Sequence, residues 1–193
     1  MSPEWLTAIG TLGTFVVIAA SAAAALLQLR HMRSSNQITA ITEIRETLES
    51  PHFQEATRWV AHTLPGLLQE PRIRTMISDP GPLAPELERA RLVANFFENI
   101  GALVHRGFVD RDAACDLWAF VVIRNWNALA PFIANRRAGL SSATLFEHFE
   151  YLAVVSKHWQ ARYPDGTYPQ NLERMPLPQP WELGRKDESS RVS

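Results

Sequence analysis

The chain has little of what marks an enzyme or a metalloprotein. Its nine glycines are scattered and form no phosphate-binding loop. Neither a Gly-x-Ser-x-Gly elbow nor a His-Glu-x-x-His motif is present. Cys115 is the only cysteine, so no intramolecular disulfide can form, which agrees with a reducing compartment. We therefore expect no enzymatic activity, no catalytic or metal-binding residues and no cofactor.

One carboxylate–histidine pair invites comparison with a di-iron bundle, which needs two Glu-x-x-His pairs facing the core. Glu49 and His52 have this spacing, but Pro51 between them predicts a helix break. A second cluster at residues 147–150 lacks the required spacing. Surface charge on amphipathic helices is the simpler interpretation of both groups.

An excess of basic charge is also lacking. The net charge is −1, and Lys157 and Lys186 are the only lysines. A nucleic-acid-binding domain normally has a basic face, so we expect no nucleic-acid partner. The other positive charges are arginines and alanine is abundant, a composition typical of GC-rich bacterial genes.

Strand patterns are absent as well. Alternation of apolar and polar residues with period two does not persist anywhere. Apolar residues instead recur at steps of three and four over most of the chain. The sequence therefore predicts an all-α fold.

Charge is missing altogether from Trp5 to Leu29. As a helix this stretch would be about 37 Å long, enough to cross a hydrocarbon core of about 30 Å, and we interpret it as a single transmembrane helix. A buried core helix is one alternative, although such a helix rarely lacks charge over this length. A cleavable secretory signal is the other, because Ala20–Ser21–Ala22 resembles a cleavage site, although no basic residue precedes the apolar run.

Flanking residues predict the orientation of this helix. Arg30, His31 and Arg33 follow the apolar run, no Lys or Arg precedes it, and Trp5 suits the outer interface. The positive-inside rule then predicts a single-pass protein of the bacterial inner (plasma) membrane, with the N-terminus outside and the C-terminal domain in the cytoplasm. Residues 1–33 would form the membrane anchor and its basic flank.

Residues 34–166 are predicted to form a cytoplasmic bundle of about four to five helices. The membrane helix should continue to Ser50, because apolar residues form one stripe at Ile38, Ile41, Ile44 and Leu48. Ser50 as N-cap and Pro51 at the first position predict a second helix. Pro65–Gly66 should end this helix, and the proline-rich residues 78–86 should form a loop. The sequence does not determine whether residues 67–86 are ordered.

The second half of the domain has the strongest helical patterns. Residues 86–106 have a broad apolar face, and Gly107 predicts a helix stop. Asp110 should cap a following helix over residues 111–133, which is apolar on most sides and is expected to be central and buried.

Pro131 should bend or end that helix. A polar turn is expected at residues 135–142, where Ser141 would cap a final helix running to about Arg162. The proline-containing residues 167–193 are predicted to be a flexible tail. Its PLPQPW segment suits either a linker or a ligand of a proline-binding groove.

Glu98 is the most notable single residue, because it lies within a strongly apolar helical pattern. A partly buried carboxylate needs a cationic or hydrogen-bonding partner, and Arg45, Arg106 and Arg124 are candidates. We predict a buried polar cluster of Glu98, His105 and Arg124. A structural ion pair is the simpler role for it, and a ligand-binding or catalytic pocket is the alternative.

Residues 96–133, FFENIGALVHRGFVDRDAACDLWAFVVIRNWNALAPFI, resemble a bacterial domain-of-unknown-function family. The helix–Gly–Asp–helix joint and the ending from Trp126 to Pro131 carry the likeness, which extends over about residues 5–163. The resemblance implies one N-terminal membrane helix followed by a small cytoplasmic helical domain. It implies no activity and no catalytic residues.

Three functions remain open on this basis. The first is a membrane-anchored interaction or oligomerisation module, with regulation as one such role, whose partners are the lipid bilayer and a second copy or another protein. Small residues four apart in the span, at Gly10 and Thr14 and at Ala20 and Ala24, would allow close helix contact. The second is an enzyme or ligand-binding protein with an interhelical pocket for a ligand that the sequence does not identify. The third is a membrane-acting effector that assembles into a pore, for which the span offers no polar lining.

Overall fold

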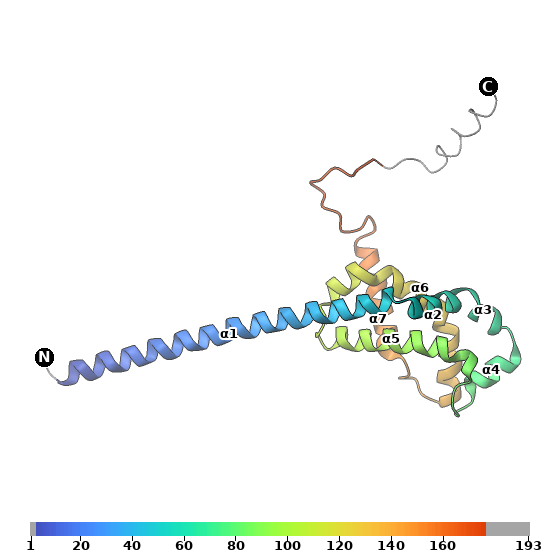
Figure 1. Cartoon of the computed structure of the whole chain (residues 1–193), viewed down its shortest axis with the longest axis horizontal. Coiled ribbons are helices and arrows are strands. Elements are labelled where there is room, and N and C mark those ends of the chain that lie inside the picture. Colours follow the sequence, from blue (N-terminus) through green and yellow to red (C-terminus); the bar gives the residue numbers. More distant parts are fainter. Residues whose placement is uncertain (1–2, 177–193) are drawn as a thin grey trace, which may run out of the picture. The chain divides into compact units, whose positions relative to one another are not determined.

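The computed structural model describes residues 3–176, of which residues 3–11, 30, 31, 33 and 34 are described by their backbone alone. Helices and connecting turns make up this part of the chain, and it contains no strand, which confirms the all-α prediction (Figure 1). The chain divides into two units, Met1–Arg162 and Tyr163–Ser193. The predicted proline-rich docking segment lies mostly beyond residue 176, outside the described residues.

Helix α1, Pro3–Glu49, is a continuous helix of 47 residues. Leu12–Leu29 is long and apolar enough to cross a membrane, and none of it is buried. An N-terminal signal sequence shares these properties. Among the described residues, Arg111–Leu140 is also long and apolar enough to cross a membrane. However, 39% of its most apolar stretch is buried, as in a core helix. The backbones of Trp5, Arg30 and Arg33 belong to α1, and their side chains lie outside the described residues.

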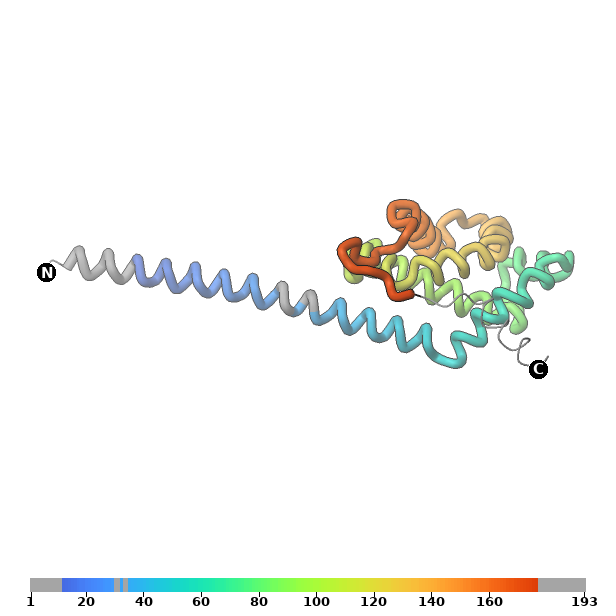
Figure 2. The backbone as a smooth tube through the Cα atoms, turned by 90° about the horizontal axis from the view of Figure 1, so that it is seen from above, coloured from blue at the N-terminus to red at the C-terminus, as the bar shows by residue number. Residues whose placement is uncertain are grey.

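The C-terminal end of α1 joins the bundle, whereas its N-terminal part extends away from it (Figure 2). Ile44 is 7% exposed and belongs to the hydrophobic core, as the predicted apolar stripe requires. Helix α2, Pro51–His62, begins as expected, because Ser50 Oγ accepts a hydrogen bond from the Phe53 N–H at 3.3 Å. A bend at Ser50 thus turns the chain from the long helix into the bundle.

The connection after α2 differs from the prediction. Helix α2 ends at His62, and Pro65–Gly66 lies inside the short helix α3, Leu64–Leu67, followed by α4, Pro71–Ser78. Proline is tolerated in a first helical turn because the N–H it lacks would have no partner there. Leu64 is fully buried, so core packing holds this short turn in place.

The joint between the next two helices agrees with the sequence. The 3-10 helix η1, Pro85–Leu87, leads into α5, Glu88–His105. Gly107 has φ 72°, the left-handed conformation that ends helices. Asp110 Oδ1 then accepts a hydrogen bond from the Ala113 N–H at 2.9 Å and caps α6, Arg111–Leu140.

Helix α6 does not end at Pro131, and the predicted polar turn at residues 135–142 is helical as far as Leu140. Pro131 and Asn127, whose carbonyl loses its helical donor to the proline, are both exposed, so water can satisfy that carbonyl. Ser141, with φ 49°, ends α6 instead of starting the last helix, which is α7, Glu147–Arg162.

Contacts with the end of α4 hold the last turns of α6 in a helix. Arg136 donates hydrogen bonds to the carbonyls of Ile77, Asp79 and Gly81. A Cβ on Gly139 would lie 2.0 Å from the Ser78 carbonyl oxygen, so only glycine permits this approach. These contacts join residues more than fifty positions apart, and no local pattern reveals them.

The core forms where α5 meets its neighbours α2, α6 and α7. Phe97 stacks on Phe149 of α7, with ring centroids 5.0 Å apart, and the neighbouring Phe96 packs on Phe53 of α2 at 4.5 Å. Helix α6 is not buried on all sides, because Leu117 is 55% exposed and Phe120 is 68% exposed. The prediction of a buried helix therefore holds for one side of α6 and is wrong for the side that carries these two residues.

Candidate functional site

Glu98 of α5 holds the start of α7. Its Oε1 lies 2.9 Å from His148 Nδ1, and its Oε2 accepts a hydrogen bond from the Phe149 N–H at 2.8 Å. Since α7 begins at Glu147, the Phe149 N–H is one of the first donors of a helix, which have no partner inside it. Both carboxylate oxygens are engaged, so Glu98 acts as a helix cap supplied by another helix.

A glycine makes this arrangement possible. Gly101 lies one turn after Glu98, and a Cβ there would lie 2.0 Å from the His148 carbonyl oxygen. Helices α5 and α7 therefore approach more closely than they could with any residue other than glycine at position 101. The sequence pointed to Glu98 but not to Gly101 or His148, because their roles depend on which helix packs against α5.

The predicted polar trio is only partly brought together. The His105 ring lies 5.4 Å from the His148 ring and 5.1 Å from the Tyr151 ring, measured between centroids. Arg124 is on α6, where its guanidinium lies 6.0 Å from the centroid of the Phe120 ring. The residues around Arg124 belong to α1, α2 and α6, so Arg124 is not part of the cluster. The polar cluster consists instead of Glu98 and His105 of α5 with His148 of α7.

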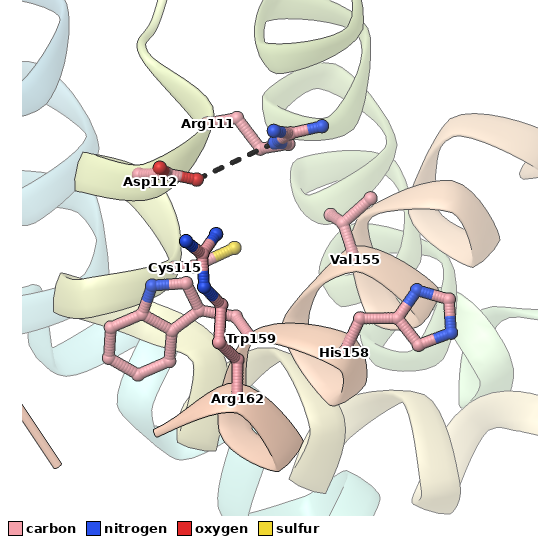
Figure 3. A pocket seen from close by; sticks show the side chains of 7 residues that line it. All are labelled: Arg111, Asp112, Cys115, Val155, His158, Trp159 and Arg162. Carbon is pink, nitrogen blue, oxygen red and sulfur yellow. Dashed lines mark ion pairs between the residues drawn. The ribbon is translucent and has the colours of Figure 1, made fainter.

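A cleft of about 190 Å³ lies between the start of α6 and the end of α7 (Figure 3). Arg111 and Asp112, whose charged groups are 3.6 Å apart, border it together with Arg162. Cys115 lies at its base and is 2% exposed, and burial raises the pKa of its thiol. A protonated, buried thiol is a poor nucleophile, and the cleft is below the usual size of a ligand site, about 300 Å³ or more.

A larger groove of about 320 Å³ lies between α1, α2 and α6. Phe53 lies buried in it, Val121 and Arg124 of α6 form one wall, and α1 contributes Leu48. The lining residues are Leu48, Phe53, Gln54, Thr57, Arg58, Val121 and Arg124.

The two exposed apolar side chains of α6 adjoin this groove. Leu117 precedes Val121 by one turn, and Phe120 lies under the guanidinium of Arg124. We call Leu117, Phe120, Val121 and Arg124 the α6 edge. Large apolar side chains exposed beside a groove are typical of an interaction surface.

No group of three His, Cys, Asp or Glu side chains suited to a metal ion occurs in the described part of the chain. The fold thus defines a class of all-α protein in which a helical domain follows a long apolar helix. In this chain the domain also has an exposed apolar edge beside a groove. Residues 15–159 match DUF4760, a domain of unknown function, and the chain belongs to this family. The match supports the resemblance to an uncharacterised domain. No curated protein and no solved structure matches the chain.

Proposed function

We propose that the chain is a membrane-anchored interaction module whose α6 edge and adjoining groove bind a second copy of the chain. Helix α1 would cross the bacterial inner membrane and hold the domain in the cytoplasm. The exposure of Leu117 and Phe120 beside the groove is the observation that carries this proposal. A monomer gains nothing from leaving two large apolar side chains in water.

Magnitudes favour association within the membrane over association in solution. Full burial of one large apolar side chain contributes about 1.5–3 kcal/mol. A dimer would bury Leu117 and Phe120 of both copies, four side chains in all, which together offer at most about 6–12 kcal/mol. This is within the cost of bringing two free domains together, about 4–15 kcal/mol. Anchoring both copies in one bilayer raises their effective concentration and reduces that cost. The pairs of small residues in α1, such as Ala20 and Ala24, add a second contact in the lipid.

We propose no catalytic role for the polar residues of the domain. The Glu98 carboxylate is engaged by His148 and by the start of α7, and burial keeps the Cys115 thiol protonated. Arg124 belongs to the α6 edge, where it covers the Phe120 ring.

Cysteine crosslinking in native membranes tests the proposal. Phe120→Cys, in a background in which Cys115 is replaced by alanine, should form a disulfide between two copies on mild oxidation. Val154→Cys on α7 is the matched control, since Val154 is also an exposed apolar residue, 45% exposed. The control should remain monomeric.

A bifunctional crosslinker extends the same test to other partners. Attached at residue 120, it should yield a species of twice the monomer mass. A crosslink to a different protein would reject self-association and keep the interaction module. A Phe120→Cys chain that forms no crosslink beyond the level of the control would reject both.

A further inference from the structure

The turn between α5 and α6 exposes an aromatic side chain at a position that is normally covered. The Gly107 N–H donates to the Val104 carbonyl at 3.1 Å, and the Phe108 N–H donates to the Leu103 carbonyl at 2.9 Å. These two bonds form a Schellman motif, in which the residue after the glycine commonly packs back on the helix. Phe108 is instead 62% exposed.

The turn is rigid, so the exposure of Phe108 is not a consequence of a loose loop. Val109, the next residue, is fully buried, and Asp110 caps α6. The Phe108 backbone is thus held between a helix end and a core residue. Its ring points into solvent because the fold directs it there.

The position of the turn along α1 suggests what covers the ring. Gln37 of α1 lines one pocket together with Gly107 and Val109, so the turn lies beside Gln37. Leu29, the last residue of the apolar stretch, precedes Gln37 by eight positions on the same helix. At about 1.5 Å per residue the turn stands about 12 Å beyond the end of that stretch.

This height is close to the lipid headgroups. The headgroup layer extends about 5–8 Å beyond the hydrocarbon core. Membrane helices are usually tilted by about 20°. The turn lies about 10 Å to the side of the α1 axis, the usual distance between packed helices, so a tilt toward the turn brings it roughly 3–4 Å closer to the membrane. The Phe108 side chain can bridge the rest.

The charges around the turn allow contact with anionic lipid. Arg106 is exposed, and its guanidinium has no ion pair or hydrogen bond with the part of the chain that the structure describes. The two carboxylates nearby are engaged, Asp110 as the cap of α6 and Asp112 with Arg111. Arg106 and Arg111 balance Asp110 and Asp112, so the turn has no net charge and apolar contact of the ring is the larger contribution.

We propose that this turn rests on the membrane surface, with the Phe108 ring in the headgroup layer and Arg106 on anionic headgroups. The contact fixes the orientation of the domain on the bilayer and leaves the α6 edge free along the side. It rests on the proposed function in one respect, because it requires α1 to cross the membrane.

A fluorescent probe on a single cysteine tests the contact. The full chain with Cys115→Ala and Phe108→Cys is labelled with an environment-sensitive dye and reconstituted in vesicles of phosphatidylcholine and phosphatidylglycerol. The emission should shift to shorter wavelength, lose its quenching by iodide, and be quenched by lipid with a nitroxide on its headgroup. The matched control is Phe120→Cys, of similar exposure in the single chain, which should be insensitive to the lipid nitroxide whether or not a second copy covers it.

One further sample separates the possible failures. A label at Val17, within the apolar stretch, reports whether α1 is in the bilayer. If residue 17 is in lipid but residue 108 is no more sensitive to the lipid nitroxide than residue 120, the contact is rejected and the proposed function stands. If residue 17 is itself outside the lipid, both are rejected. Protection of residue 108 from iodide without quenching by the lipid nitroxide means that protein covers the ring, and this also rejects the contact.

Discussion

Glu98 shows how one side chain can connect two helices. Its carboxylate lies between the His148 ring and the Phe149 N–H, and its side chain is 24% exposed. A charged hydrogen bond of this kind contributes about 1.5–3 kcal/mol, and loss of a helix cap costs about 0.5–2 kcal/mol. At the residue scale it is the polar group on which the α5–α7 contact most depends.

We expect Glu98→Ala to lower the free energy of unfolding by about 1–2 kcal/mol, because the Phe149 N–H loses its acceptor. Glu98→Gln should cost less, since its amide oxygen can still accept that bond. Denaturation of the purified chain in detergent, followed by circular dichroism, measures both. Glu55→Ala is the control, because the pair of Glu55 with Arg89 is exposed and contributes little. Equal losses for Glu98→Ala and Glu55→Ala would contradict the cap.

Cys115 permits a second prediction at this scale. Burial raises the pKa of its thiol, and the neighbouring Ser156 side chain opposes this shift without reversing it. Alkylation by iodoacetamide near neutral pH should therefore be much slower in the folded chain than in denaturant, because the thiolate is the reactive species. Similar rates in the two states would mean that the thiol is open to solvent.

The same shift has a consequence at high pH. A thiol whose pKa is raised on folding stabilises the folded state fully below its unfolded pKa of 9.0, and this contribution is lost as the pH rises through the folded pKa. Stability should fall more in the parent than in Cys115→Ala as the pH passes 9, measured by denaturation across that range.

At the scale of the elements, the spacing between helices depends on two glycines. Gly101 lets α5 approach α7, and Gly139 lets α6 approach α4. In both places an added Cβ would meet a backbone carbonyl oxygen at 2.0 Å, and a backbone cannot move aside as a flexible side chain does. The bundle is therefore intolerant of any side chain at these two contacts.

We expect Gly101→Ala to destabilise the domain by about 1–3 kcal/mol, the usual cost of overpacking, or more if α7 separates from α5. Gly66→Ala in α3 is the matched control, because nothing lies within 4 Å of its Cβ position. That change should be neutral or stabilising by up to about 1 kcal/mol, since alanine is the better helix former. Thermal unfolding of the two variants side by side measures the difference.

At the scale of the whole molecule, the main feature is the long helix α1, whose two ends have different surroundings. The side chains of Leu12–Leu29 make no contact that buries them, in contrast to the amphipathic end of the same helix at Ile44. One continuous helix thus combines an apolar segment with a segment that packs on the bundle. If α1 crosses a membrane, as we propose, any partner of the domain would be met close to the membrane surface.

We expect the full chain to remain in the membrane fraction after alkaline carbonate extraction, because transfer of its apolar stretch to water is unfavourable. A reporter that fluoresces only in the cytoplasm, fused after Ser193, should be active, as the basic flank at Arg30 and Arg33 predicts. Arg30→Glu with Arg33→Glu is the informative variant, because it removes the charge bias and should reduce the cytoplasmic signal. Release by carbonate, or processing near Ala22, would instead indicate a cleaved signal.

Local chemistry explains which features of the fold were predictable from the sequence. The caps at Ser50 and Asp110 and the stop at Gly107 each depend on hydrogen bonds or backbone angles within a few residues. The helical patterns of α1 and α5 are equally local, because a 3.6-residue repeat places one face toward the core whatever covers it. These features are determined by the sequence alone.

Tertiary packing decided the rest. Helix α6 continues past Pro131 because α4 accepts hydrogen bonds from Arg136. Glu98 contacts His148 because Gly101 lets α7 come close to α5. Phe120 and Phe108 are exposed although Ala119 and Val109 beside them are buried, since the elements that cover α5 and α6 leave these two sides open. Burial depends on which elements meet in space, and periodicity along one helix does not contain that information.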